Sequence, residues 1–446
     1  MNTQSELEWL ASLEFFGIKL GLEQTEELFR RAGNPHHKLK LIHVAGSNGK
    51  GSVCAFTEAG LRAAGWKTGF YSSPHLVRPG ERFRINGVPC PEERLAAILA
   101  QIRPLAQDMA KEGKHVTYFE VTTLAAALLF AEGKVDFALW ETGMGGRLDA
   151  TNIVLPELSV ITGISMEHSD RLGDTLAKIA FEKAGIIKRG IPVFCSGATP
   201  PEALEVIRAR ADEMGAECFL SDPFPEGPLQ MERLTASSDA ARRESGIHQK
   251  FPLKSGEIVT LPLAGPCQRR NAALSAEILR FLSRKYAFDF RRALDGFAFA
   301  SWPARMQFFP ELHLVMDAAH NPEGVESLRD ALRELHPGKK FHFIFGAFSD
   351  KDFRTGLEIL APMAKSFRFV SLHSHRSSRS TEEMAAALRE IDPSIPSEST
   401  DLTTALFTEF PAEEGEKREK KVLCGSLHLC GEALEILENT LGKRLV

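Results

Sequence analysis

The segment HVAGSNGKGS at residues 43–52 places the strongest constraint on how this chain can fold. It follows an apolar stretch at 40–45 that is typical of a buried strand, and it begins a helical pattern over 51–64. A glycine-rich turn between a strand and a helix presents backbone N–H groups to an anion, and the helix N-terminus adds positive potential. We interpret the segment as a phosphate-binding loop in which Lys50 neutralises phosphate charge. The alternative is a strand-to-helix turn without a ligand.

The loop departs from the common pattern G-x-x-x-x-G-K-S/T at two positions. Val44 stands where the first glycine is usual, and Gly51 separates Lys50 from Ser52. Neither change removes the lysine or the hydroxyl that such a loop uses, so the prediction of a phosphate site stands.

The rest of the chain predicts an α/β fold with parallel sheets, because strand-like runs alternate with helical patterns. Several runs are continuously apolar, as in strands that are covered on both faces. The expected strands are 40–45, 135–141, 158–164, 192–195, 313–317, 341–346, 366–372 and 421–425. Residues 220–265 contain short alternating segments, and there we expect antiparallel strands and loops. A predicted helix at 268–286, followed by Trp302-Pro303 and new strand–helix units, divides the chain into domains 1–298 and 299–446.

Composition excludes several classes of function. The 54 basic and 59 acidic residues give a net charge of −5, which provides no electrostatic surface for nucleic acid. No apolar run approaches the roughly 18 residues of a membrane-spanning helix, and the first residues lack the pattern of a signal peptide. Seven cysteines without a C-x-x-C pair predict reduced thiols. We therefore expect a cytoplasmic protein that binds neither nucleic acid nor membranes.

Two polar residues follow predicted strands close to the phosphate loop. Glu141 ends the strand at 135–141, and His168 lies just beyond the strand at 158–164. The carboxyl ends of parallel strands form the ligand crevice of α/β sheets, and a carboxylate there suits Mg²⁺. A surface carboxylate and a hydrogen-bonded structural histidine are the alternatives.

Lys183 lies on the apolar face of a predicted helix that Asp174 or Thr175 caps. An inward lysine is unfavourable unless it is paired or modified. It can extend its ammonium group to solvent, pair with Glu141 or Glu182, or serve a function.

Three weaker motifs lie further along the chain. Asn271 is a helix cap or a ligand-binding amide, Arg305 follows the predicted boundary, and Asp317 ends a strand. The planar guanidinium of an arginine matches phosphate oxygens, so Arg305 is a candidate phosphate ligand.

These motifs together resemble the folylpolyglutamate synthases and bifunctional dihydrofolate synthases of the Mur ligase superfamily. The matching segments run in consistent order from about residue 15 to 435: HVAGSNGKGS (43–52), YSSPHL (71–76), ERFRING (81–87), ETGMGGRLDATN (141–152), EKAGIIKRGIPV (182–193), DAAHNP (317–322) and GSLHLCGE (425–432). Four residues depart from the family pattern: Ser47 replaces Thr, Glu167 replaces Asp, and Ala304 and Ala318 replace Gly. The resemblance implies a P-loop Mur-ligase-like ATPase domain and a smaller Rossmann-like α/β C-terminal domain.

The resemblance also implies the ligands of ATP and Mg²⁺. The residues expected to hold ATP are Asn48, Gly49, Lys50, Gly51, Ser52, Asn271, Arg305 and Asp317. Those expected to hold Mg²⁺ are Ser73, Glu141, His168 and Lys183, the last as the family's carbamylated lysine, with Lys188 a weaker candidate. The catalytic set is Lys50, Lys183, Arg305 and His320.

A second implied site binds a pterin. Its expected residues are Lys19, Leu20, Gly21, Leu22, Thr117, Tyr118, Phe119, Glu120, Leu148, Asp149 and Ala150. Phe119 would stack on a flat aromatic ring, and Asp149 would accept hydrogen bonds from it.

The function implied by the resemblance is an ATP-dependent amide ligase that acts through an acyl phosphate. It would add L-glutamate both to dihydropteroate and to reduced folates, as a monomer. The alternatives within the superfamily are a monofunctional folylpolyglutamate synthase and another Mur-type amino-acid ligase. Outside it, a non-catalytic nucleotide switch and a phosphotransferase are the alternatives.

Overall fold

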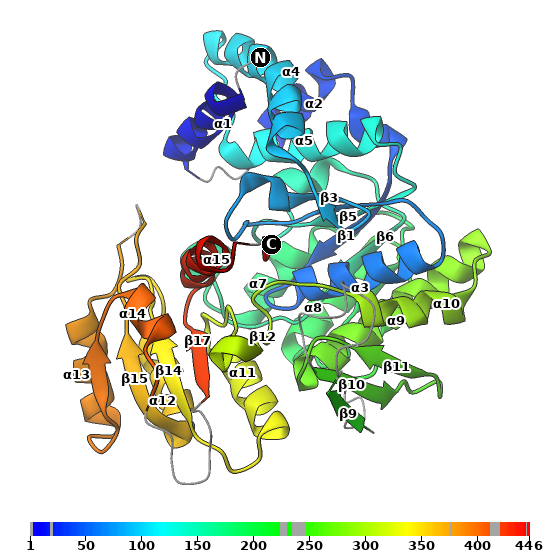
Figure 1. Cartoon of the computed structure of the whole chain (residues 1–446). Helices are drawn as coiled ribbons and strands as arrows, with labels where there is room; N and C mark the ends of the chain where they lie inside the picture. The colour runs from blue at the N-terminus through cyan, green and yellow to red at the C-terminus, as the bar shows by residue number, and fades with distance from the viewer. Residues whose placement is uncertain are drawn as a thin grey trace. The chain divides into compact units, whose positions relative to one another are not determined.

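The computed structural model describes residues 3–17, 21–223, 230–233, 247–374, 377–410, 420–442 and 444–446 (Figure 1). Its backbone contacts divide the chain into two compact units. The first unit contains residues 1–225 and 270–300, and the second contains 226–269 and 301–446. The break after Ala300 lies next to the boundary expected at 298. Residues 226–269, which we expected in the first domain, group with the second unit instead.

An eight-stranded sheet organises the first unit, with the strand order β4-β3-β2-β5-β1-β6-β7-β8. The strands are β1 (Lys40–Ala45), β2 (Thr68–Tyr71), β3 (Phe83–Ile85), β4 (Val88–Pro89), β5 (Phe137–Glu141), β6 (Leu158–Ile161), β7 (Val193–Cys195) and β8 (Cys218–Leu220). All neighbours pair in parallel except β2 with β3 and β3 with β4. β1 therefore lies in the interior of the sheet, as its mainly apolar sequence predicts.

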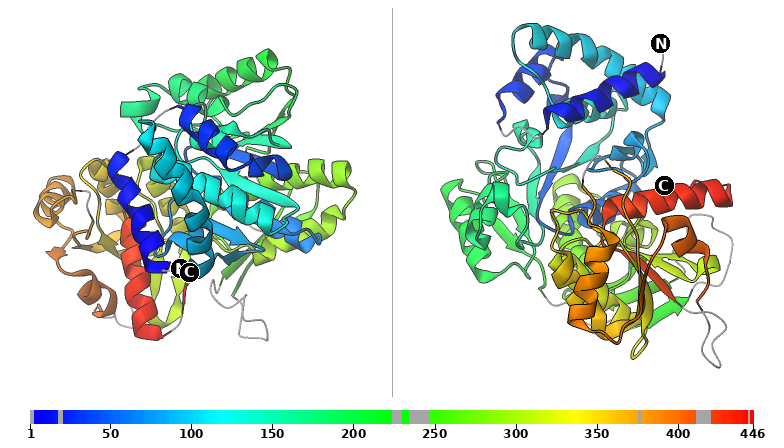
Figure 2. Two further views of the ribbon diagram at one scale, coloured as in Figure 1. Left: turned by 90° about the horizontal axis from the view of Figure 1, so that it is seen from above. Right: turned by 90° about the vertical axis from the view of Figure 1, so that its left-hand side faces the viewer.

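Helices pack against both faces of this sheet. Four of them, α1 (Thr3–Ser12), α2 (Glu23–Arg31), α4 (Glu92–Lys111) and α5 (Tyr118–Glu132), contribute to one apolar cluster and gather on one side of the unit (Figures 1 and 2). The remaining helices are α3 (Lys50–Ala63), α6 (Ser169–Leu172), α7 (Leu176–Ala184), α8 (Pro201–Glu213), α9 (Pro266–Tyr286) and α10 (Phe290–Asp295). The first residues of α9, up to Arg269, belong to the second unit.

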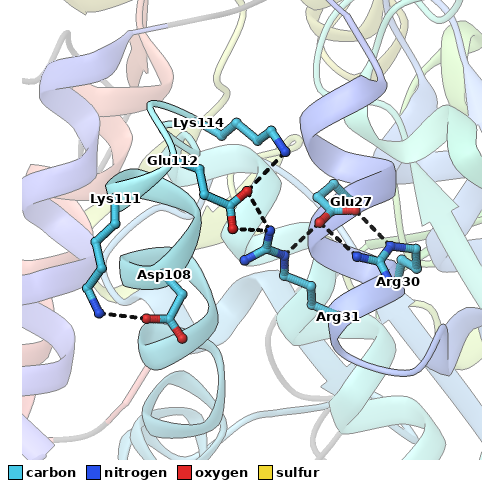
Figure 3. A network of polar contacts seen from close by, with 7 residues as sticks. All are labelled: Glu27, Arg30, Arg31, Asp108, Lys111, Glu112 and Lys114. Carbon is cyan, nitrogen blue, oxygen red and sulfur yellow. Dashed lines mark hydrogen bonds and ion pairs between the residues drawn. The ribbon is translucent and has the colours of Figure 1, made fainter.

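Charged side chains join α2 to the end of α4 (Figure 3). Glu27 accepts hydrogen bonds from Arg30 and Arg31, and Arg31 also donates two to Glu112, at 2.7 and 2.8 Å. Exposed ion pairs of this kind contribute at most about 1 kcal/mol each. The buried Leu28 and Phe29 on the same helix therefore hold α2 in place more strongly than its charges do.

The second unit contains a six-stranded sheet with the order β12-β13-β17-β14-β15-β16, parallel except for β12. Its strands are β12 (Gln307–Phe309), β13 (Leu314–Met316), β14 (Phe341–Phe345), β15 (Ala364–Phe369), β16 (Ser397–Ser399) and β17 (Lys421–Cys424). Its helices are α11 (Pro322–Leu335), α12 (Phe353–Leu360), α13 (Thr381–Ile391), α14 (Leu402–Phe407) and α15 (Leu427–Leu441). A separate antiparallel sheet joins β9 (Gln230–Arg233), β10 (Ile247–Pro252) and β11 (Ile258–Leu261), which confirms the antiparallel strands expected in that region.

The structure contains all eight strands expected from the apolar runs, with ends that differ by at most three residues. It adds short strands that the sequence pattern does not show, among them β2, β3 and β8. No helix in the described part of the chain is long and apolar enough to span a membrane.

Candidate active site

The topology of the first sheet brings four predicted site segments to one edge. β2, β5, β1 and β6 are consecutive parallel neighbours, so their carboxyl ends lie side by side. Ser73 follows β2, Glu141 ends β5, the phosphate loop follows β1, and His168 comes after β6. This edge is where ligands bind in open α/β sheets.

The glycines of the phosphate loop are required by its backbone. Gly49 caps α3 with a φ of 89°, and a Cβ there would lie 2.6 Å from Oδ1 of Asn271. Gly46 has a φ of 150°, and a Cβ there would lie 1.8 Å from Oγ1 of Thr162. Asn271 thus lies against the loop as expected, although it is inside α9 and is not its cap.

The side chain of Lys50 folds back over this loop. Its Nζ donates hydrogen bonds to the carbonyl oxygens of Gly46, at 2.8 Å, and Ser47, at 3.2 Å. Thr162 supports the same turn by donating from its hydroxyl to the carbonyl of Asn48, at 2.7 Å. The ammonium charge is therefore held beside the N-terminus of α3, where an anion is most favourable.

Lys183 is buried, as its place on the apolar face of α7 predicts, with 1% of its surface exposed. Thr175 is the cap of this helix. The partner of Lys183 is neither Glu141 nor Glu182. Its Nζ lies 2.6 Å from Oε1 of Glu167 and 2.9 Å from the carbonyl oxygen of Gly46. Sequence reasoning missed this partner, which lies in the segment between β6 and α6.

Burial and charge shift the pKa values of this pair. Burial lowers the pKa of Lys183 to about 8, although the neighbouring Glu167 opposes the shift. Burial alone would raise the pKa of Glu167, but Lys183, Lys50 and His168 together lower it to about 2. A substantial fraction of Lys183 can therefore lose its proton near pH 8, which is a requirement for any reaction at its nitrogen.

We expect the Glu167 carboxylate to make stability sensitive to acid. Because its pKa is lower in the folded chain, the stabilisation is complete above the unfolded value of 4.5 and is lost as the pH falls towards 2. Glu167→Gln should remove up to about 3 kcal/mol of this pH dependence. Urea unfolding at pH 7, 4.5 and 3 measures it. Parallel curves of stability against pH for the two proteins would contradict the assignment.

The expected metal ligands differ in how deeply they are buried. Glu141 is buried, with 5% exposed, and stands beside Val44 in the sheet. Ser73 is half-buried, and His168 is exposed where α6 begins. Among the described residues, no three His, Cys, Asp or Glu side chains gather closely enough to hold a metal by themselves. The predicted Mg²⁺ site therefore also needs the Ser73 hydroxyl and a carbamylated Lys183 as ligands.

Glu81 organises the loop that carries Ser73. Its carboxylate accepts hydrogen bonds from the backbone N–H groups of Leu76, Val77 and Arg78, at 2.8, 2.9 and 2.5 Å. It is almost fully buried, with 5% exposed. The first residue of the ERFRING motif therefore fixes the backbone just after Ser73, a role that the motif did not reveal from sequence.

Replacing Glu81 by glutamine should destabilise the chain by about 1–3 kcal/mol, because the amide has only one oxygen for three buried N–H donors. Thermal unfolding measures the effect, and Glu93→Gln, at an exposed site on α4, is the matched control. Equal stabilities for the two variants would show that the carboxylate does not hold the loop.

Two residues of the expected pterin site serve the start of α5. Thr117 caps this helix, and the Glu120 carboxylate accepts hydrogen bonds from the Thr117 N–H, at 2.7 Å, and hydroxyl, at 2.8 Å. The Phe119 ring lies against the backbone of Gly143, because a Cβ on that glycine would be 2.6 Å from the ring. The tip of the Phe119 ring therefore contacts the chain itself. Its stacking on a ligand stays a prediction.

Asp149 also has a structural role. Its carboxylate accepts hydrogen bonds from the N–H groups of Gly143, Met144 and Thr151, at 2.8–3.0 Å, and from the Thr151 hydroxyl at 2.5 Å. Burial raises the pKa of this carboxyl, while the same hydrogen bonds oppose the rise.

The remaining pterin-side predictions lie in the neighbouring segments. The N–H of Gly21 is 3.5 Å from the carbonyl oxygen of Leu148, so two expected segments do meet. Leu22 precedes α2, and Ala150 begins a short 3₁₀ helix. Lys19 and Leu20 lie outside the described residues.

In the second unit, Asp317 holds the loop that contains Arg305. Its carboxylate accepts hydrogen bonds from the N–H groups of Met306 and Ala319, both at 2.9 Å. Burial raises the pKa of Asp317, and the nearby Arg305 charge opposes that rise. His320 follows Asp317 in the loop after β13, with Nδ1 2.9 Å from the Ala318 carbonyl oxygen.

Comparison with known proteins decides the family. The Mur ligase middle domain matches residues 44–193, and the Mur ligase glutamate ligase domain matches residues 304–410. A dihydrofolate synthase/folylpolyglutamate synthase of Bacillus subtilis is 37% identical over 381 residues, which is 84% of this chain and 86% of that protein. The chain belongs to the dihydrofolate synthase/folylpolyglutamate synthase family of Mur ligases.

Other members of this family match over most of their length. A dihydrofolate synthase/folylpolyglutamate synthase of Escherichia coli is 32% identical over 437 residues, covering 97% of this chain and 95% of that protein. The structure of a Mycobacterium tuberculosis folylpolyglutamate synthase complexed with ADP and AMPPCP has a TM-score of 0.83 at 28% identity, over 98% of this chain and 99% of that one. The E. coli FolC structure with DHPP and ADP has a TM-score of 0.79 at 30% identity, over 98% of each chain.

One departure from the family pattern has a structural consequence. Ala304, at the position of a family glycine, is fully buried with a φ of 55°, in the left-handed region that glycine favours. Ala318, the other alanine at a glycine position, does not have a positive φ. Alanine is therefore strained at position 304 and unstrained at position 318.

Ala304→Gly is expected to stabilise the chain slightly, by about 0.5 kcal/mol. Relief of left-handed strain, at about 1–2 kcal/mol, exceeds the extra backbone entropy that glycine loses, at about 0.5–1 kcal/mol. Ala318→Gly is the matched control and should destabilise the chain. Unfolding midpoints in urea test the opposite signs, and equal shifts in one direction would contradict the argument.

Proposed function

We propose that this chain is an ATP-dependent ligase that joins L-glutamate to folate-type carboxylates through an amide bond. The observation that carries the proposal is the sheet edge that brings the phosphate loop, Ser73, Glu141 and the buried Lys183 together in a member of this ligase family. The names and bound nucleotides of the relatives support ATP as the energy source.

The reaction we propose proceeds in two steps. A carboxylate oxygen of the acceptor attacks the γ-phosphorus of ATP, the bond to the β-phosphate oxygen breaks, and ADP and an acyl phosphate form. The amine of glutamate then attacks the acyl carbon, loses a proton, and displaces inorganic phosphate. Lys50 and the N–H groups at the start of α3 would hold and neutralise the transferring phosphoryl group. No side-chain nucleophile is required.

We propose that Mg²⁺ is held by Ser73, Glu141, His168 and a carbamylated Lys183. The hydroxyl and carboxylate oxygens fit a hard cation, and they follow neighbouring strands, β2 and β5. When bound, the ion would neutralise phosphate charge. The lowered pKa of Lys183 supports its carbamylation, because an uncharged amine is the form that adds CO₂. In the structure Lys183 is unmodified, and its ammonium group forms an ion pair with Glu167.

We also propose roles for Arg305, Asp317 and His320, which lie in the second unit. Arg305 would bind phosphate oxygens, since its fork of N–H donors matches them. Asp317 holds the Arg305 loop through two backbone hydrogen bonds, so its contribution would include positioning this arginine. His320 would face the nucleotide or the incoming glutamate.

We propose that both dihydropteroate and reduced folates are acceptors, as for the bifunctional relatives. A folylpolyglutamate synthase without the second activity is the other candidate, and relatives that carry only that name favour it. A monomeric state and a cytoplasmic location are also parts of the proposal.

Release of ADP and phosphate with and without glutamate tests the reaction class. A ligase should release both products only when acceptor, ATP and glutamate are all present. Binding of ATP without turnover would indicate a nucleotide switch, and transfer of phosphate to a stable acceptor product would indicate a phosphotransferase. Either result would overturn the proposal.

A further inference from the structure

Two cysteines meet at the β8 edge of the first sheet, in a part of the unit that the proposed ligase site does not use. Cys195 ends β7 and Cys218 begins β8, and their Sγ atoms are 4.0 Å apart. Cys218 stands opposite Val193, and Cys195 stands opposite Leu220. The two cysteines are therefore diagonal neighbours on the same face of the sheet.

The two thiols differ in their exposure. Cys195 is fully buried in the apolar cluster under α8, whereas Cys218 is half-buried at the rim of that cluster. β8 is the last strand in the order of this sheet within the described part of the chain. A small reagent can therefore reach Cys218 first, and Cys195 lies directly behind it.

The contact between the two thiols also shifts their pKa values. A hydrogen bond from the Cys195 thiol lowers the pKa of Cys218, with Arg208 of α8 assisting and burial and Asp212 of α8 opposing. The hydrogen bond to Cys218, together with burial, raises the pKa of Cys195. The first proton therefore leaves more easily than the second, as in other interacting pairs, and the charge resides on the more exposed sulfur.

We propose that Cys195 and Cys218 form a thiol–disulfide exchange site for small disulfides. The Cys218 thiolate attacks one sulfur of the disulfide, the S–S bond breaks, and one half leaves as a thiolate, so that Cys218 carries a mixed disulfide. Cys195 then gives its proton to solvent and attacks the Cys218 sulfur, which releases the second half as a thiol. The two cysteines are oxidised and the small disulfide is reduced, so the electrons balance.

Closing this bond requires the sulfur atoms to approach from 4.0 Å to about 2.05 Å. Because diagonal neighbours have Cα atoms about 7–8 Å apart and a disulfide needs at most about 6.8 Å, the backbone of the edge strand β8 has to shift towards β7. The product would join the edge strand β8 to β7. Because the pair is separate from the phosphate loop, the proposal does not depend on the ligase function.

Cys90 provides a control within the same molecule. It is also half-buried, but burial raises its pKa to about 11, and no second cysteine contact is found for it among the described residues. At neutral pH it should react much more slowly than Cys218, because the thiolate is the attacking form.

The test is incubation of the whole chain with oxidised glutathione at pH 7.5, with modified peptides located by mass. Cys218 should react first, about 10-fold or more faster than Cys90, and should continue to a Cys195–Cys218 disulfide. In Cys195→Val, which removes the hydrogen-bond donor and the second sulfur, the ratio of the Cys218 rate to the Cys90 rate should fall, and glutathione should stay attached to Cys218. Because the ratio is internal, general loosening of the fold would raise both rates together.

Two results would overturn the proposal. The first is preferential reaction of Cys90 or Cys267, and the second is an unchanged rate ratio in Cys195→Val. A mixed disulfide that persists on Cys218 in the unmodified chain would equally rule out the second step. Cys195→Ala, which also lacks a hydrogen-bond donor, serves as a second variant if the valine variant does not fold.

Discussion

Lys50→Ala is expected to lower turnover by about 1,000-fold or more while leaving the fold intact. The ammonium group lies over the phosphate loop and donates to the carbonyl oxygens of Gly46 and Ser47. Its removal takes away the cation that would face the transferring phosphoryl group. Gly46 and Ser47 are buried, but the Gly46 carbonyl keeps the Lys183 ammonium group as a donor, so the loss of stability should be small, about 1 kcal/mol.

Steady-state turnover and thermal unfolding on the same preparations measure the two effects. The matched control is Lys67→Ala, because Lys67 is exposed immediately before β2, at the opposite edge of the same sheet. This variant should retain normal turnover. Near-normal turnover in Lys50→Ala would remove the phosphate loop from the mechanism.

Lys183→Ala should have the largest effect on stability, about 3–5 kcal/mol, and should also abolish turnover. The substitution leaves a cavity in place of the ammonium group that now lies 2.6 Å from the Glu167 carboxylate and 2.9 Å from the Gly46 carbonyl oxygen. Lys178→Ala is the control on the same helix, because that lysine forms only an exposed pair with Asp174. Its loss should cost under about 1 kcal/mol.

A second variant separates the ion pair from the proposed carbamate. Lys183→Ala combined with Glu167→Gln removes both charges, so it should recover part of the stability without recovering turnover. A carbonyl signal from ¹³C-labelled bicarbonate, present in the native chain and absent from Lys183→Ala, would support the carbamate. Normal turnover in the single variant would exclude Lys183 from the mechanism.

Local sequence patterns predicted the elements that carry the site. The phosphate loop could be recognised because its glycines, its lysine and the flanking strand and helix are contiguous in the chain. β1, β5 and β6 could be recognised because buried parallel strands are continuously apolar. β2 and β8 were missed, because β2 contains Gly69 and β8 is an edge strand without a fully buried residue.

Tertiary partners were harder to predict than the residues themselves. The apolar face of α7 indicated that Lys183 points inward, but Glu167 becomes its partner only when β6 pairs with β1. Likewise, Asp149, Glu120 and Glu81 hold backbone N–H groups of their own loops. A motif shows that such a carboxylate is needed, but not whether it contacts a ligand or the chain.

The most direct test of the proposed function is a product assay resolved by mass. The chain is supplied with Mg-ATP, L-glutamate and either dihydropteroate or tetrahydrofolate. We expect dihydrofolate from the first acceptor and a glutamate-extended folate from the second. A product from tetrahydrofolate alone would contradict the dual activity and leave a folylpolyglutamate synthase. No glutamate adduct from either acceptor, in protein that binds ATP, would contradict the proposed function itself.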